Sequence, residues 1–160
     1  MLRSISECCP NLIVLDLNNN NRVTGDSLYY LVPTMTNPGC TKLEKLYIQD
    51  CSVDPYDVAN VILKLPTLTL IGYKEVGSAL IIMNRWLNEE SRHPGLKLTH
   101  FDNSESLLTK TDGRILKLLN SLAPDICNLK VRLNDDDSGC LANFKKLRLL
   151  EVRCFTRRGK

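Results

Sequence analysis

A nine-residue pattern of apolar side chains recurs along the chain and constrains its fold more than any other feature. In NLIVLDLNNNNRV, residues 11–23, the pattern consists of Leu12, Leu15 and Leu17 followed by Asn20. The same offsets recur in LEKLYIQDC (43–51) and ICNLKVRLN (126–134), and the first three of them recur in LRLLEVRCF (147–155) as Leu147, Leu150 and Val152. Two weaker copies begin at 68 and 96, so the chain holds about six units at intervals of 31, 25, 28, 30 and 21 residues.

The alternation within each copy predicts one short strand per unit. In Leu15-Asp16-Leu17 the two leucines share one face of a strand, and the aspartate faces the opposite side. The inward leucines of one unit can be covered only by neighbouring units, which favours parallel strands stacked in chain order. We predict a single array over residues 1–160 with strands near 12–18, 43–49, 68–74, 96–102, 126–132 and 147–153.

An ordinary βαβ sheet is the main alternative fold. The strands of such a sheet are buried on both faces and read as continuous apolar runs. The predicted strands instead contain polar residues, among them Asp16, Asn18, Lys45 and Gln49. The pattern therefore favours a sheet with one exposed face.

The ninth position of the pattern holds a residue that can bond to the backbone. Asn20, Cys51 and Asn134 occupy this position. An inward amide or thiol there can bond to backbone groups that the turn leaves unpaired, each of which would otherwise cost about 1–3 kcal/mol. We predict that these three residues form a structural ladder.

Helices are predicted between the strands. Asp54-Pro55 combines a cap residue with proline at the first helical position, and Pro66 ends that segment. Asp112 caps a second helix that ends at Pro124, and Thr24 or Asp26 opens an earlier one that carries Leu28 and Leu31 toward Met35. The predicted buried stripes are Val58, Val61, Ile62 and Leu65; Val76, Leu80, Met83 and Leu87, with Trp86 packing between units; and Ile115, Leu118, Leu119 and Leu122.

The recurring pattern L-x-x-L-x-L-x-x-N/C resembles the leucine-rich repeat, and the unit length and cysteine resemble its ribonuclease-inhibitor-like and cysteine-containing subclass. The segments 9–12 (CPNL), 40–43 (CTKL) and 23–28 (VTGDSL) are similar to F-box and leucine-rich-repeat proteins. The resemblance implies an α/β solenoid, with a curved parallel sheet on the concave side and helices on the convex side. It also implies that the repeats bind a target, while a separate F-box binds the core of a ubiquitin ligase.

The chain departs from this family in one respect, because its sequence contains no F-box. It begins with LRSISECCP, which resembles the tail of a repeat helix, and neither end has an obvious capping unit. We therefore expect a fragment, or a short member, of a longer array.

The outward residues of the predicted strands are the candidate partner-binding site, because repeat arrays bind on the strand face. We single out Tyr47, Arg132 and Arg153, since tyrosine and arginine are enriched among interface hot spots. The positions also include Val14, Leu70, Gly72, Leu98, Asn128 and Leu149. The site residues that we predict are Asp16, Asn18, Lys45, Tyr47, Gln49, Lys74, His100, Asp102, Lys130, Arg132, Glu151 and Arg153.

Charge is unevenly distributed along the chain. Residues 1–80 carry 6 basic and 8 acidic side chains, whereas residues 81–160 carry 15 and 10. The basic residues near the end are Lys145, Lys146, Arg148, Arg153, Arg157, Arg158 and Lys160. Such a run can attract an acidic protein segment or a phosphate backbone, although it is more often a solvated helix face or a frayed end.

Motifs for metal binding and catalysis are weak. Asp135-Asp136-Asp137-Ser138-Gly139 has its glycine misplaced for an EF-hand loop, and position twelve is Lys146 instead of glutamate. No motif flanks a cysteine that would pair with His93 or His100. We expect no enzyme activity, no metal and no cofactor.

Cysteine usage and the N-terminus bear on where the chain resides. The seven cysteines are odd in number and include no C-x-x-C pair, which favours reduced thiols. The start lacks the apolar segment of a secretory signal, and no apolar run reaches the roughly 18 residues of a membrane span. We expect a chain of the cytoplasm or nucleus.

Together these features predict a non-catalytic module that binds another protein on its strand face. The family resemblance implies the substrate-recognition part of an F-box type ubiquitin ligase, whose adaptor subunits would bind through a region absent here. Two alternatives stay open: a scaffold or signalling array without a ubiquitin role, and a nucleic-acid contact through the basic C-terminal half.

Overall fold

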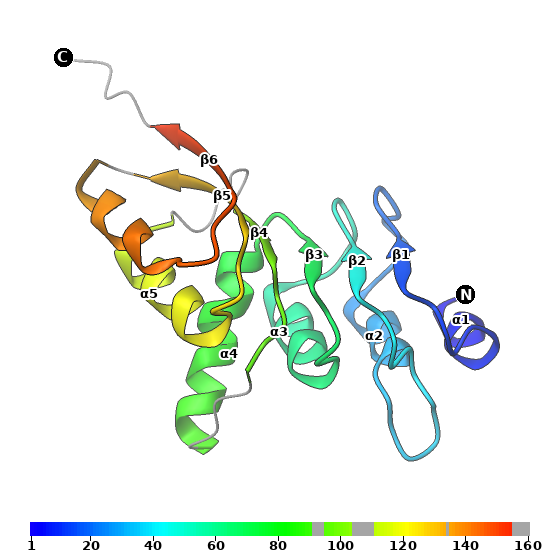
Figure 1. Cartoon of the computed structure of the whole chain (residues 1–160). Coiled ribbons are helices and arrows are strands. Elements are labelled where there is room, and N and C mark those ends of the chain that lie inside the picture. The colour runs from blue at the N-terminus through cyan, green and yellow to red at the C-terminus, as the bar shows by residue number, and fades with distance from the viewer. Residues whose placement is uncertain (91–94, 104–110, 134, 155–160) are drawn as a thin grey trace.

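The computed structural model describes residues 1–90, 95–103, 111–133 and 135–154 as an α/β fold with one six-stranded sheet (Figure 1). The strands are parallel and lie side by side in chain order. They are β1 (Val14–Asp16), β2 (Lys45–Tyr47), β3 (Leu70–Gly72), β4 (His100–Asp102), β5 (Asn128–Leu133) and β6 (Leu149–Cys154). Each predicted strand range overlaps one of them, although the first four strands are only three residues long.

Helices lie together below the row of strands in Figure 1. They are α1 (Leu2–Cys8), α2 (Gly25–Leu28), α3 (Pro55–Lys64), α4 (Val76–Glu90) and α5 (Gly113–Leu122), with 3-10 segments η1 (Tyr29–Leu31) and η2 (Asp135–Asn143). Consecutive helices contact one another from α1 to α5, and η2 contacts α5. The chain therefore advances in one direction through both layers.

Two helices begin at the predicted cap residues. Asp54 Oδ1 accepts hydrogen bonds from the N–H groups of Tyr56 (2.8 Å) and Asp57 (3.0 Å) at the start of α3. Asp112 Oδ1 likewise accepts from the N–H groups of Arg114 (2.9 Å) and Ile115 (3.0 Å) at α5. Both carboxylates satisfy donors that a helix leaves unpaired at its first turn.

The core lies between the sheet and the helices. The middle residue of each of the first four strands is buried, as is Leu129 of β5: Leu15, Leu46, Ile71, Phe101 and Leu129. The stripes predicted for α3 and α4 are buried beneath them. At the edge of the core, Trp86 of α4 packs against Tyr56 of α3 with ring centroids 6.2 Å apart, so this side chain does join neighbouring units.

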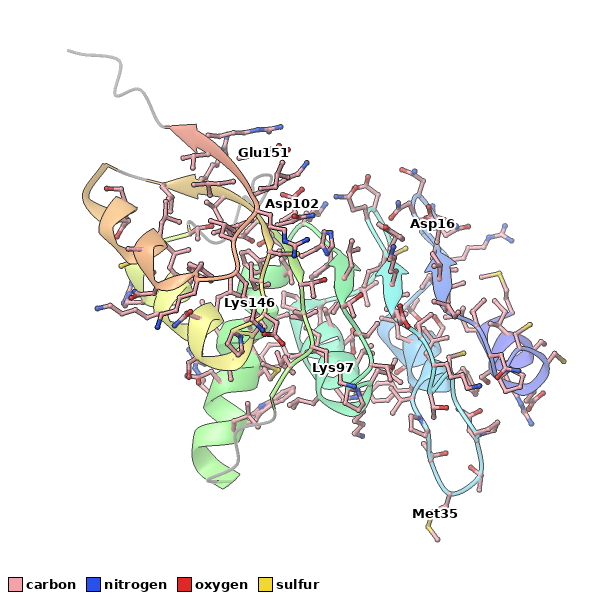
Figure 2. All side chains as sticks on the ribbon, in the orientation of Figure 1. Asp16, Met35, Lys97, Asp102, Lys146 and Glu151 are labelled. Carbon is pink, nitrogen blue, oxygen red and sulfur yellow. The ribbon has the colours of Figure 1, made fainter. Side chains whose placement is uncertain are left out.

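Helix α2 is shorter than the helix predicted from Thr24 or Asp26 toward Met35. It does not continue to Met35, because Val32 is extended before Pro33 and a residue before proline disfavours helical backbone. A loop follows, and Asn37 holds its base: Nδ2 donates to the carbonyl oxygens of Tyr30 (2.7 Å) and Val32 (3.1 Å). Met35 is fully exposed at the tip of this loop (Figure 2).

Three burial predictions were wrong. Leu98 was expected to face outward but is buried, because the strand of that unit begins only at His100. In α5, Leu118 was expected to be buried but is half-buried, whereas Leu116, which was not predicted, is buried. Leu150 and Val152 lie on the inward side of β6, yet they are 42% and 38% exposed because β6 is the outermost strand of the described sheet.

The helices of the described residues are short beside the roughly 20 residues of a bilayer-spanning helix. Helix α4 is the longest, at 15 residues. Over the described ranges, no helix combines the length and apolar character needed to cross a membrane.

Candidate functional site

The exposed face of the sheet carries side chains in rows that run across the strands. The register aligns Val14, Lys45, Leu70, His100, Asn128 and Leu149 in one row. Asp16, Tyr47 and Gly72 begin a second row, and Asp102, Lys130 and Glu151 align in β4 to β6. Figure 2 shows Asp16, Asp102 and Glu151 on β1, β4 and β6. In-register stacking therefore brings residues of distant sequence onto one surface.

The remaining predicted site residues lie near the carboxyl ends of the strands. Asn18, Gln49 and Lys74 follow β1, β2 and β3, while Arg132 and Arg153 face each other in the ladder between β5 and β6. Asn18 also has a structural contact, since its Oδ1 accepts a hydrogen bond from the N–H of Gln49 at 2.7 Å. All twelve predicted residues thus lie on or beside the exposed face.

A hollow of about 400 Å³ lies in the middle of this face. Its lining includes the aromatic ring of Tyr47, the apolar side chain of Leu70 and polar groups of Gln49, His100 and Asn128. The lining comes from strands of successive units and from the residues just after them. Its shape therefore depends on the register between units and not on any single sequence motif.

Gly72 forms part of the floor of this hollow. A Cβ atom at position 72 would lie 2.6 Å from Cδ1 of Tyr47, which is closer than van der Waals contact allows. The aromatic ring therefore lies across the glycine of the next strand. Any larger residue at position 72 would displace this ring and fill the hollow.

His100 borders the hollow as a neutral side chain. Its Nδ1 lies 2.8 Å from Oγ1 of Thr99. Burial, and secondly the positive charge of Lys45, lower the pKa of His100 below 6.5. At neutral pH the imidazole therefore contributes a hydrogen-bonding group and no charge.

Charges of both signs lie on the exposed face. Lys130 Nζ is 3.1 Å from Glu151 Oε1, and Lys74 Nζ is 3.5 Å from Oδ1 of Asp50. Both pairs are exposed, and such pairs typically contribute at most about 1 kcal/mol. Each pair neutralises one positive charge on the face and adds little to the stability of the fold.

The ladder residues contact the backbone of the first turn. Asn20 Nδ2 donates to the carbonyl oxygens of Leu17 (3.0 Å) and Asn18 (3.2 Å), although much of Asn20 is exposed. The thiol of Cys51 donates to the same Leu17 oxygen at 3.1 Å. Asn134, the third predicted ladder residue, lies outside the described residues.

Sequence reasoning missed Asn103, one of four buried polar or charged residues in the described part of the chain. Asn103 is completely buried; its Oδ1 accepts from the N–H of Gly77 (3.2 Å), and its Nδ2 donates to Thr111 Oγ1 (3.0 Å). In the recurring pattern the ninth position of this unit is residue 104 and not 103. A search that let the polar residue of the pattern stand at the eighth position as well as the ninth would have identified Asn103.

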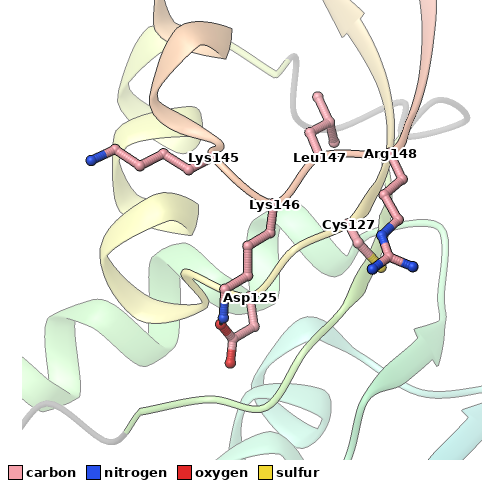
Figure 3. Close-up of a pocket in the computed structure, with 6 residues that line it drawn as sticks. All are labelled: Asp125, Cys127, Lys145, Lys146, Leu147 and Arg148. Atoms are coloured by element: carbon pink, nitrogen blue, oxygen red, sulfur yellow. The ribbon is translucent and has the colours of Figure 1, made fainter.

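A second hollow, of about 520 Å³, lies beside the segment that enters β6 (Figure 3). Lys145, Lys146 and Arg148 all line this hollow, but their side chains extend in different directions, and that of Lys146 contacts Asp125 (Figure 3). Arg153 lies near the other end of the same strand, and Arg157, Arg158 and Lys160 lie outside the described residues.

The candidate metal and cysteine sites take structural contacts where they are described. Asp137 Oδ1 accepts a hydrogen bond from the N–H of Gly113 at 2.9 Å, which ties η2 to the start of α5. Within the described ranges, no group of three or more His, Cys, Asp or Glu side chains is arranged to hold a metal ion. His93 lies outside those ranges.

Sequence comparisons add no relative to this description. No protein-family model matches the chain, and neither does any curated protein. The function is therefore inferred from the residues, their pattern and their geometry.

Proposed function

We propose that the chain is a leucine-rich-repeat solenoid that binds another protein on the exposed face of its sheet. The recurring pattern supports this reading, because each unit contributes one strand and the strands follow one another in chain order. A curved array of this kind leaves its strand side chains free for a partner, since the helices cover only the opposite side.

The observation that carries the proposal is the hollow on this face. Interface anchors are typically aromatic or arginine side chains in well-packed pockets, surrounded by polar residues that exclude water. Tyr47 is a half-buried aromatic residue at the centre of the face, and Gln49, His100 and Asn128 surround the hollow beside it. Lys130, Arg132 and Arg153 extend the same surface toward β6.

Within this class we propose a role as the substrate-recognition part of an F-box type ubiquitin ligase. The support is the similarity of segments 9–12, 23–28 and 40–43 to F-box and leucine-rich-repeat proteins. This role requires an F-box elsewhere in the same gene product. A scaffold or signalling array would use the same face without adaptor or cullin subunits.

The test compares proteins captured by the tagged chain and by two variants. Tyr47→Ala should remove its face partners, since truncation of an anchor tyrosine costs about 2 kcal/mol, or about thirtyfold in affinity. Tyr29→Ala is the matched control, because Tyr29 is a 45% exposed tyrosine of η1 on the helical side. Identical sets of captured proteins from both variants would overturn the protein-binding role.

The ligase role has its own readout. The complete gene product is pulled down from cells and scored for adaptor and cullin subunits. Their presence supports the F-box role, and their absence together with Tyr47-dependent partners leaves the scaffold role. Capture of RNA or DNA that weakens steeply with salt would instead favour the nucleic-acid alternative.

A further inference from the structure

We propose that the hollow over Gly72 binds an extended, uncharged peptide segment of the partner, with one apolar side chain of that segment seated against Tyr47 and Leu70. This inference rests on the proposed protein-binding role of the exposed face. It adds the chemistry that the face would recognise, which neither the recurring pattern nor the family resemblance supplies.

The space for the apolar side chain exists because residue 72 is a glycine. Tyr47 lies beside Gly72 in the register and covers part of it, and Leu70 precedes it on the same face of β3. The surface that remains is apolar on these two sides and is bordered by the neutral His100 of β4. An apolar side chain gains free energy by covering such a surface, whereas a charged one would lose hydration.

The groups that would bind the peptide main chain are two carboxamides. Gln49 and Asn128 are half-buried in the lining, and among the described residues neither carboxamide makes a hydrogen bond. Each carboxamide offers two donors and an acceptor, which matches the alternating N–H and C=O groups of an extended chain. The hydroxyl group of Tyr47, two residues before Gln49, adds a further donor and acceptor to the lining.

The distance between the carboxamides sets the length of the segment. Gln49 follows β2 and Asn128 begins β5, so three strand spacings of about 4.8 Å separate them across the sheet, or about 14 Å. Asn128 is aligned with Lys45, four residues before Gln49, which adds about 13 Å along the strands. The diagonal of about 19 Å matches about six extended residues.

The charge of the lining favours an uncharged segment. Asp102 and Lys130 are the two charged residues of its lining, and they are of opposite sign. His100 is neutral at pH 7 because its pKa is lowered. An acidic or basic segment would therefore find no net opposite charge in the hollow.

The test uses capped six-residue peptides as probes of the ¹⁵N-labelled chain in NMR titrations. Glycine-based hexapeptides with N-acetyl and N-methylamide caps and one central leucine or phenylalanine carry one apolar side chain and are long enough to span both carboxamides. They should shift the backbone amide of Gly72 and the side-chain amides of Gln49 and Asn128 saturably. The corresponding lysine and glutamate probes should bind about tenfold more weakly, because half-burying an apolar side chain is worth a factor of that order.

Two variants and a control test separately the apolar contact at Gly72 and the hydrogen bonds of the carboxamides. Gly72→Ala should abolish binding of the leucine probe, because the added methyl group displaces the Tyr47 ring into the hollow. Asn128→Leu keeps the shape of the side chain and should weaken the same probe. Asn120→Leu, at a half-buried carboxamide on α5, should leave it unchanged.

The outcomes distinguish this inference from the proposed function. Equal binding of a charged probe at Gly72, or unchanged leucine binding by Asn128→Leu, overturns the peptide chemistry even if Gly72→Ala fails to fold. If no probe shifts Gly72 but a partner is still captured through Tyr47, the peptide chemistry is wrong and the protein-binding role stands. If no probe shifts Gly72 and no partner is captured through Tyr47, the proposed function is wrong as well.

Discussion

Asn19 and Asp50 adopt the same left-handed backbone, with φ of 61° and 54°, at positions 31 residues apart. The interval between the first two units is also 31 residues, so the two residues occupy one position in successive units. Asparagine and aspartate tolerate this conformation better than other side-chain-bearing residues. The asparagine run after the first strand is thus explained in part by the turn that the chain makes there.

The same interval relates the contacts that join these two units. Lys42 Nζ donates to Asn11 Oδ1 at 2.7 Å, and Ser52 Oγ donates to the carbonyl oxygen of Asn21 at 2.7 Å. Each pair lies 31 residues apart. Equivalent positions therefore touch from unit to unit, which is the expected result of in-register stacking.

The left-handed turn gives the first prediction. Asn19→Ala should lower the free energy of unfolding by about 1 kcal/mol, because alanine is disfavoured at positive φ. Asn19→Gly should leave it unchanged or raise it. Urea denaturation measures both, with Asn21→Ala in the same run as the control. A loss with Asn19→Gly as large as with alanine would show that the side chain, and not the backbone, matters.

The base of the loop after η1 gives the second prediction. Ser6 is completely buried, and its Oγ shares its proton between the carbonyl oxygen of Arg3 (2.8 Å) and Asn37 Oδ1 (3.0 Å). Asn37→Ala removes this acceptor and two backbone contacts, so the chain should lose about 1–3 kcal/mol of stability. Met35→Ala, at the exposed tip of the same loop, should change stability by less than about 0.5 kcal/mol. Equal thermal unfolding midpoints for the two variants would contradict this role of Asn37.

The strands and helix starts could be predicted because they depend on local rules. The two-residue period of a strand places Leu15, Leu46 and Leu129 on one side, and each is buried. Asp54 and Asp112 cap helices because a carboxylate accepts from N–H groups two and three residues ahead. Neither rule requires knowledge of any other unit.

The features that could not be predicted depend on contacts between units. The hollow exists because Tyr47 lies over Gly72, and only the register between β2 and β3 brings those residues together. Asn103 is buried against Gly77 and Thr111, which its own pattern position does not indicate. The exposure of Leu150 depends on what lies beside β6, and a repeating pattern does not contain that information.

The cap of α5 gives the third prediction. Burial alone would raise the pKa of Asp112, but hydrogen bonds from Ile115 and Arg114 and the charge of Arg114 outweigh burial and lower the pKa below 3.8. A carboxyl group with a lowered pKa stabilises the folded chain above its unfolded pKa and loses that contribution as the pH falls through the folded value. Asp112→Asn should therefore show a shallower loss of stability below about pH 4.

The matched control for this prediction is the other cap, Asp54, which starts α3 in the same way. Urea midpoints are measured at neutral pH and at several acidic values for the wild type, Asp112→Asn and Asp54→Asn. Asparagine is itself a good cap residue, so the neutral-pH stabilities should change little. An Asp112→Asn profile parallel to that of the wild type through the acidic range would refute the assignment.

The pair of His100 and Lys45 gives the last prediction, which concerns the hollow directly. Burial, and secondly the charge of Lys45, lower the pKa of His100 below 6.5. A histidine with a lowered pKa stabilises the folded chain above pH 6.5, and this contribution is lost as the pH falls from 6.5 through the folded pKa. Lys45→Gln should therefore raise the pKa of His100, whereas Lys74→Gln should not, because Lys74 is paired with Asp50.

The pKa is measured from the imidazole Cε1–H signal in an NMR pH titration, with His100→Gln assigning the signal between the two histidines. High salt should move the wild-type pKa upward, since it screens the charge of Lys45, and should leave Lys45→Gln less affected. If Lys45→Gln leaves the pKa unchanged, burial alone neutralises His100. The carboxamides and the apolar seat of the hollow would then be independent of the charge on β2.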